Sequence, residues 1–167
     1  FKSVAETRES IIKNLKNTRN LNFEFEQNTN GKIEKGNCTI EYPKKIFCEY
    51  RRNNKILVSN GKSLVIKTIS SYYRYPLEKT PLNIILDKSF LINKINTLEG
   101  INIQNNLINF NITEKNNEIS IFFDNKSFDL IGWQNTDIYQ NFNITYLSFI
   151  RKNRILPKNL FKLPTQN

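Results

Sequence analysis

The sequence predicts a mainly β protein (α+β class) with about ten or eleven antiparallel strands, an N-terminal helix and helices inserted near the middle of the chain. Three observations predict this fold. Apolar and polar residues alternate over most of the chain, and turn residues recur at short intervals. Only two segments, about 3–17 and 81–98, have helical spacing. The 167 residues contain no repeat or low-complexity linker, so we expect a single domain over residues 1–167.

The first predicted element is a helix over about residues 3–17. Ser3 is a candidate N-cap, and Glu6 follows three residues later as in a capping box. The apolar residues that share one face of this helix are Val4, Ile11, Ile12 and Leu15. This pattern favours an amphipathic helix that packs on the rest of the domain.

The next part of the chain predicts a succession of short strands. Leu21, Phe23 and Phe25 alternate with polar residues, which is typical of a strand with one buried face. The further strand-like runs are CTIEY, KIFCEY, KILVS, SLVIKTI and SYYRY, with turn signals at 28–31, 53–54 and 60–61.

Cys38 and Cys48 lie on two strands joined by a tight turn at residues 42–45. A three-residue loop pairs 38 with 48, whereas a two-residue loop offsets the two cysteines by one position. Directly opposed residues have Cβ atoms about 4.5–5.5 Å apart, at the upper edge of what a disulfide accepts. The pair is therefore either a disulfide or two small buried apolar side chains.

The segment over about 81–98 interrupts the alternation. Pro81 stands near its start, Leu82, Ile85 and Leu86 form a helical stripe, and Gly100 ends it. We interpret it as one or two short helices. The strand-like runs that follow are INIQN, LINFNIT, EISIFFD, SFDLIGW and NFNITYLSF, and the tail RILPKNLFKLP predicts irregular backbone with a short final strand.

The composition excludes several kinds of chemistry. The chain has no His, so it has no His-based triad or His metal ligand, and its two Cys cannot form a four-ligand zinc site. The clustered carboxylates Asp124, Asp129 and Asp137 are typical of turns and strand faces. No apolar run is long enough to span a membrane. We therefore expect a protein that is not an enzyme and needs no cofactor or metal.

The formal charge of +10 is concentrated in residues 44–55 and 151–162. Because 27 Asn, 23 Ile and 18 Lys accompany a single Ala, biased gene composition alone can explain two solvated lysine-rich stretches. A face that docks an acidic partner or anionic headgroups is a second interpretation, and a nucleic-acid interface with stacking on Tyr72, Tyr73 and Tyr75 is a third. The candidate docking residues are Arg51, Arg52, Arg151, Lys152 and Arg154.

A strongly curved sheet of this size is an incomplete barrel, and its concave face must be covered. Side chains alone would make it a core, whereas loosely packed helices would leave an apolar ligand cavity. The inward-phase candidates on the strands are Ile40, Tyr42, Ile46, Cys48, Tyr50, Leu64, Ile66, Phe110, Ile119, Ile121 and Phe123. The candidates from the inserted helices are Leu82, Ile85, Leu86 and Phe90. Membership of an ordinary core is the alternative for each of them.

Several runs follow one another in a definite order along the chain. The first half carries IEYPKKIFCEY and ILVSNGKSLVIKTISSYYRYPLEKTPLNIIL, and the second half carries EISIFFDNKSFDLIGWQNTDIYQNFNITYLSF and ILPKNLFKLP. The positions that carry the pattern are Pro43, Ile46, Tyr50, Gly61, Thr80, Pro81, Leu130, Trp133, Asp137, Phe161 and Pro164. In this succession, over about residues 3–164, the sequence resembles the periplasmic outer-membrane lipoprotein carrier family (LolA).

The resemblance implies an unclosed β-barrel with a helical lid. It also implies a monomeric carrier that shields lipoprotein acyl chains in the periplasm. Such a carrier takes its cargo from an inner-membrane lipoprotein-releasing transporter and passes it to an outer-membrane lipoprotein receptor. The chain begins at Phe1 without Met, so we expect that a signal peptide or another leading segment was removed. The absence of an N-terminal lipidated Cys favours the carrier over the anchored receptor of the same fold.

One position departs from the family pattern. In the family an Arg directly precedes the motif Pro and holds the lid through hydrogen bonds, whereas this sequence has Tyr42 there. A Tyr hydroxyl carries no charge and no bidentate fork. We therefore expect a lid latch that is weaker or built differently, with Tyr42 as its candidate residue.

Overall fold

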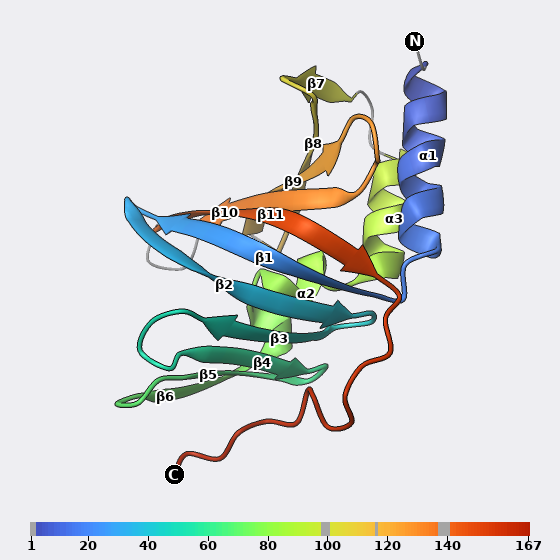
Figure 1. The fold of residues 1–167 in the computed structure, drawn as a ribbon. Coiled ribbons are helices and arrows are strands. Elements are labelled where there is room, and N and C mark those ends of the chain that lie inside the picture. Colours follow the sequence, from blue (N-terminus) through green and yellow to red (C-terminus); the bar gives the residue numbers. More distant parts are fainter. Residues whose placement is uncertain (1–2, 98–100, 116, 137–140) are drawn as a thin grey trace.

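The computed structural model describes residues 3–97, 101–115, 117–136 and 141–167, and it shows one sheet with helices on its inner face (Figure 1). The helical elements are α1 (Val4–Lys16), the short 3-10 helix η1 (Leu77–Lys79), α2 (Leu82–Ile85) and α3 (Lys88–Thr97). The strands are β1 (Asn20–Thr29), β2 (Lys32–Glu41), β3 (Lys45–Tyr50), β4 (Ile56–Asn60), β5 (Ser63–Lys67), β6 (Tyr72–Pro76), β7 (Asn102–Gln104), β8 (Leu107–Glu114), β9 (Asn117–Asp124), β10 (Leu130–Thr136) and β11 (Phe142–Lys152).

The sheet has 11 strands in the order β6-β5-β4-β3-β2-β1-β11-β10-β9-β8-β7. All neighbours are antiparallel, and the sheet is not closed. Two meanders, β1–β6 and β7–β11, join through the pairing of β1 with β11. The edge strands are β6 and β7, and the helical insert connects one to the other. These features confirm the predicted fold class.

The N-terminal helix forms as the sequence predicts. The Ser3 hydroxyl accepts a hydrogen bond from the Glu6 N–H at 3.1 Å, and Ile11 and Leu15 are buried. The Arg8 guanidinium donates to the Ile95 carbonyl of α3. The helices α1 and α3 thus lie side by side against the half of the sheet that contains β8–β11 (Figure 1).

The helical insert divides into two helices rather than one. The helix α2 ends at Ile85, and the Asp87 carboxylate accepts a hydrogen bond from the Phe90 N–H at 3.0 Å at the start of α3. Two predicted positions lie outside the described residues: residue 98, the last of the 81–98 span, and Gly100, the residue expected to end it. The short α2 lies over the inner face near β2 and β3 (Figure 1).

The prediction of a short final strand in the tail is wrong. The chain after β11 forms turns and irregular backbone, and its Pro residues cannot donate to a ladder. Side chains anchor it instead: Lys67 Nζ donates to the Thr165 carbonyl at 2.6 Å, and the Tyr72 hydroxyl donates to the Pro164 carbonyl at 3.1 Å. The tail therefore crosses the outer face of β5 and β6, where Val65 is fully buried.

The register of the β2–β3 hairpin decides whether Cys38 and Cys48 can form a disulfide. Glu41 pairs with Lys45, so the loop has three residues, and Cys38 pairs directly with Cys48. The two cysteines form a disulfide. Tyr42 lies in the turn and not on a strand, which corrects the strand position predicted for it, but its side chain still packs against the core. No helix in the described parts of the chain is both long and apolar enough to cross a membrane.

We predict that replacing both Cys38 and Cys48 with Ala lowers the free energy of unfolding by about 2–3 kcal/mol, because the bridge restricts the unfolded chain. Urea unfolding of the variant and of oxidised wild type measures this difference. Thiol titration of unfolded wild type should find two thiols only after reduction. Equal stability of the variant and the oxidised wild type would contradict the prediction.

Candidate functional site

A partly open cavity of about 370 Å³ lies between the inner face of the sheet and α2. Scaled from an apolar cavity of about 150 Å³ that holds benzene, it has room for about 15 carbon atoms. The residues that line it are Phe25, Gln27, Thr29, Lys32, Glu34, Cys38, Ile46, Cys48, Tyr50, Lys55, Leu57, Leu64, Ile66, Thr80, Pro81, Leu82, Ile85, Trp133, Asn135, Asn143 and Thr145.

The deep part of the cavity is apolar. The disulfide forms part of the wall beside Ile46, and Leu82 and Ile85 reach it from the insert. Trp133, the single tryptophan of the chain, comes from β10 and meets Phe23 edge-on with ring centroids 6.5 Å apart. These surfaces can bind an apolar ligand through the hydrophobic effect and offer no acid–base pair for catalysis.

An aromatic pair on β1 and β3 depends on a glycine between them. The rings of Phe25 and Tyr50 meet edge-on with centroids 4.9 Å apart. Gly36 lies opposite both residues in the sheet register. A Cβ there would lie 2.1 Å from the Glu49 carbonyl oxygen and 2.8 Å from the Phe25 ring. Gly36 is therefore needed for this part of the wall.

The rim of the cavity is polar. Lys55 Nζ lies 3.2 Å from both carboxylate oxygens of Glu34 and 4.3 Å from the centroid of the Tyr50 ring. Gln27 donates to the Thr145 hydroxyl at 3.0 Å. Burial, and secondarily the charge of Glu34, raises the pKa of Tyr50, so this phenol stays neutral. The site therefore has an apolar interior and a hydrogen-bonding entrance.

The structure divides the predicted cavity residues into two groups. Those on the cavity wall are Ile46, Cys48, Tyr50, Leu64, Ile66, Leu82 and Ile85. Those in the packed core are Ile40, Leu86, Phe110, Ile119, Ile121 and Phe123, while Tyr42 and Phe90 are half-buried beside it. All the predicted residues that lie on strands face inward. Those on β8 and β9 belong to the core beside α1 and α3, whereas the cavity lies under α2 and extends from β5 to β10.

The amino-acid sequence did not predict the polar rim of the cavity or two aromatic residues in its wall, Phe25 and Trp133. Phe25 shares the inward phase of Phe23, so the alternation in β1 could have found it. Glu34 and Lys55 carry no such signal, because charged residues in strands usually face solvent. Trp133 was named only as one of the positions at which the sequence resembles the LolA family.

The ties between the insert and the sheet lie around residues 86–88. The Lys44 N–H donates to the Leu86 carbonyl at 2.9 Å, and Lys44 Nζ lies 3.7 Å from the Asp87 carboxylate. Lys88 Nζ donates to the Thr18 carbonyl at 2.8 Å and lies 5.4 Å from the centroid of the Tyr42 ring. Tyr42 thus contacts the insert through its ring.

Burial explains the pKa shifts of two groups at this tie. It raises the pKa of Tyr42 and lowers the pKa of Lys88, since each charged form is poorly solvated there. The Tyr42 phenol is therefore neutral at ordinary pH. The ammonium group of Lys88 lies over the Tyr42 ring and donates to the Thr18 carbonyl. It therefore places a positive charge beside a side chain that has none.

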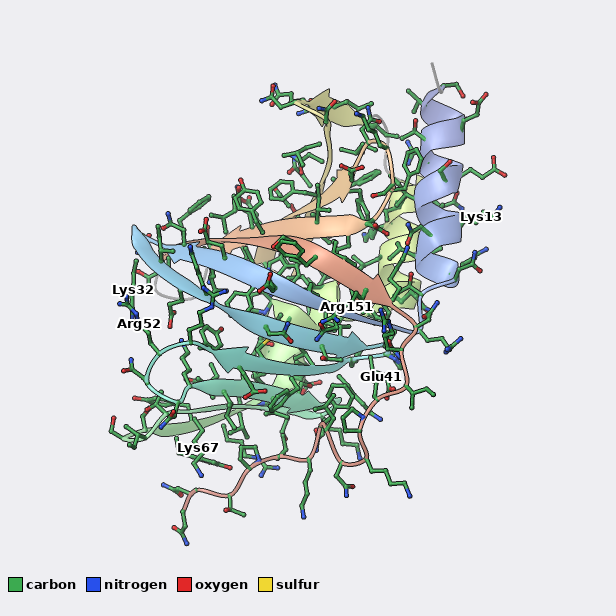
Figure 2. All side chains as sticks on the ribbon, in the orientation of Figure 1. Lys13, Lys32, Glu41, Arg52, Lys67 and Arg151 are labelled. Atoms are coloured by element: carbon green, nitrogen blue, oxygen red, sulfur yellow. A yellow bond between two sulfur atoms is a disulfide. The ribbon has the colours of Figure 1, made fainter. Side chains whose placement is uncertain are left out.

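The tertiary structure separates the basic residues that are close in sequence. Lys44 contacts the helical insert, whereas Arg51 lies at the other end of β3 and pairs with Glu24 at 3.7 Å. Figure 2 shows Arg52 beside Lys32 at one end of the sheet and Arg151 at the opposite end. The basic residues of the stretch 44–55 therefore do not form one cluster: Lys44 lies at one end of β3, and Arg51 and Arg52 lie at the other.

Several residues of the second basic stretch, 151–162, make contacts that stabilise the fold. Lys152 pairs with Asp129 at 2.7 Å, and the Arg151 guanidinium donates to Asn22 at 3.0 Å. The backbone of Arg154 exchanges two hydrogen bonds of 2.9 Å with the Asn20 side chain. Arg151 and Arg154 keep exposed side chains and can still meet a partner.

The carboxylates considered for catalysis have structural roles. Asp124 accepts hydrogen bonds from the backbone N–H groups of Ser127 at 2.7 Å and Lys126 at 2.9 Å. The bond from Ser127 is the main cause of the lowered pKa of Asp124. Asp137 lies outside the described residues. Across the described ranges, no group of three or more Cys, Asp or Glu side chains is arranged to hold a metal ion.

The described part of the chain therefore combines an open antiparallel sheet with a largely apolar cavity under an inserted helix. The family described as outer membrane lipoprotein carrier protein LolA matches residues 16–164. The chain therefore belongs to the LolA family, a fold family that includes lipoprotein-binding carriers and related lipid-binding proteins.

The comparison with solved structures concerns the fold alone. An uncharacterized conserved protein from Thermus thermophilus has a similar fold, with a TM-score of 0.55 at 8% identity, over 99% of this chain and 96% of that chain. A LolA superfamily protein from Nitrosomonas europaea has a TM-score of 0.48 at 9% identity, over 93% of this chain and 97% of that chain. No curated protein matches the sequence.

We predict that Lys88→Met loosens the insert, because it removes the bond to Thr18 and the charge over Tyr42. Amide exchange in residues 82–97 should become about fivefold faster, as the loss of about 1 kcal/mol implies. Lys94→Met is the control, since Lys94 contacts Phe90 within the same helix. Hydrogen-exchange mass spectrometry measures both, with β1 as the internal reference. Equal exchange in both variants would contradict a lid tie at Lys88.

Proposed function

We propose that this protein is a periplasmic carrier that holds the acyl chains of lipoproteins in its cavity. It receives them from an inner-membrane lipoprotein-releasing transporter and delivers them to an outer-membrane lipoprotein receptor. The observation that carries the proposal is the apolar cavity of about 370 Å³ beneath an insert tied to the sheet by few bonds. Membership of the LolA family supports it.

The energetics of an acyl chain fit this role. Each buried methylene contributes about 0.8 kcal/mol, so about 15 carbon atoms in the cavity contribute about 12 kcal/mol. Such a chain does not cross water unaided at a useful rate. A carrier must also release it, so the bound and open arrangements of the insert should differ by only a few kcal/mol. The short α2 and the three polar ties at residues 86–88 suit that requirement.

The polar rim suits an amphiphilic cargo. Gln27, Glu34 and Lys55 can hydrogen-bond the head of a molecule whose chain lies inside. Lys55 and Glu34 also satisfy each other, so the rim carries no unpaired charge at this point.

A second candidate is another lipid-binding protein of the same fold, closer to a receptor than to a carrier. The cavity volume favours this second candidate, because a single acyl chain fills the space. Binding a single-chain lipid but no lipoprotein would point to this alternative.

We predict that palmitate and a palmitoylated lipopeptide change the emission of Trp133, because this tryptophan lines the cavity. Leu57→Phe should weaken binding about tenfold or more, since the added ring atoms displace about three methylenes. Arg74→Phe, on the outer face of β6, is the control. Fluorescence titration gives the affinities, and mass spectrometry of protein purified from cells identifies bound lipid. A wild-type protein that binds neither ligand would overturn the proposed function.

We predict that the double reversals Arg51→Glu/Arg52→Glu and Arg151→Glu/Arg154→Glu each slow cargo transfer about tenfold at low salt, through lost electrostatic steering. The effect should shrink at physiological salt. Lys152 is left unchanged, because its reversal would break the ion pair with Asp129.

The matched control for these reversals is Lys13→Glu/Lys16→Glu, which makes the same charge change on α1. Transfer of a lipoprotein from vesicles that contain the releasing transporter measures the rates. If all three double variants slow transfer equally, net charge and not a docking surface is responsible.

A further inference from the structure

The cavity is too small for the whole of the proposed cargo. It has room for about 15 carbon atoms, which is one acyl chain, whereas a lipoprotein that carries several chains exposes more. The inference that follows rests on the proposed function. It concerns the place of an acyl chain that does not fit inside the cavity.

A pair of tyrosines extends the cavity wall toward the open edge of the sheet. In the register of β5 and β6, Tyr73 is opposite Ile66 and Tyr75 is opposite Leu64. Directly opposed residues project from the same face of a sheet with Cβ atoms about 4.5–5.5 Å apart. Because Leu64 and Ile66 line the cavity, both tyrosines lie on the cavity side, next to its wall.

The two rings form one exposed surface. They are stacked with centroids 6.4 Å apart and an interplanar angle of 12°. Tyr73 is 54% exposed and Tyr75 is 41% exposed, although both adjoin apolar residues that are buried or half-buried. Large apolar side chains that gather on one surface without cover are typical of a binding site.

The strand that carries the tyrosines is held in place from its outer face. The Tyr72 hydroxyl donates to the Pro164 carbonyl, and Lys67 on β5 donates to the Thr165 carbonyl. These bonds fix the tail against the outer side of β5 and β6. The exposure of Tyr73 and Tyr75 therefore belongs to an ordered edge strand.

We propose that a second acyl chain of the cargo lies along Tyr73 and Tyr75 while the first chain occupies the cavity. Each ring offers an apolar face to the methylenes, and its hydroxyl can remain in water. The surface is continuous with the cavity wall at Leu64 and Ile66, so two chains of one head group can reach both places.

The surroundings favour an acyl chain over a nucleobase. A nucleic-acid platform combines aromatic rings with cations that track the backbone. Arg74 lies between the two tyrosines in sequence and therefore projects from the opposite face of β6. The residues opposed to the tyrosines, Ile66 and Leu64, are aliphatic.

Calorimetric titration with two probes tests the proposal: palmitate, and a synthetic lipopeptide with three palmitoyl chains. The variant is Tyr73→Ser/Tyr75→Ser. The control is Tyr146→Ser, which removes a tyrosine that is 44% exposed and stacked on Phe122 but on the outer face. Circular dichroism and thermal unfolding check that each variant folds. A single Tyr75→Ser exchange replaces the double variant if that one unfolds.

The expected result is an affinity for the three-chain lipopeptide that falls about tenfold in the Tyr73/Tyr75 variant, with palmitate affinity changed less than about twofold. Tyr146→Ser should leave both unchanged. An equal loss for both probes, no loss for either, or the same loss in Tyr146→Ser would overturn the proposal. Salt-sensitive binding of a single-stranded oligonucleotide that needs these tyrosines would also overturn it. A wild-type protein that binds neither probe would overturn the proposed function as well.

Discussion

The antiparallel pairing of β1 with β11 is the interaction on which the rest of the structure depends. It joins two meanders into one sheet and leaves β6 and β7 as the free edges. The segment between those strands must then connect one edge to the other. It does so across the inner face, as η1, α2 and α3. The position of the helical insert over the inner face therefore follows from the topology, since the chain has to connect the two edges there.

The inner face divides because its cover is uneven. Two helices of 13 and 10 residues, α1 and α3, pack on the half with β8–β11 and make a continuous core. The other half is covered by shorter elements, η1 with 3 residues and α2 with 4 residues. Elements that short leave part of the space over these strands unfilled, and a cavity remains. Lys55 and Glu34, which form an ion pair, make its mouth polar.

For the proposed carrier, different parts of this arrangement would hold and release the ligand. The disulfide and the packed aromatics Phe25 and Tyr50 make the sheet side of the cavity rigid. The insert side is held by buried apolar residues such as Ile85 and Leu86 and by polar contacts at Asp87 and Lys88, of which the partly exposed Lys44–Asp87 pair is weak. In the proposed carrier, the insert is the part expected to move when a ligand enters or leaves.

Alternation and capping are local properties, so the amino-acid pattern predicted the main helices and strands and the inward phase of the strands, although it wrongly predicted a final strand in the tail. It also excluded His chemistry. It left the disulfide open, since a change of one residue in the loop would have separated Cys38 from Cys48. Only the tertiary structure decided which inward residues form cavity and which form core, because that depends on what a distant helix covers. It likewise decided that Arg52 and Arg151 lie at opposite ends of the sheet and that Lys88 stands over Tyr42. Such neighbours meet through strand register and chain topology, and neither appears in local spacing.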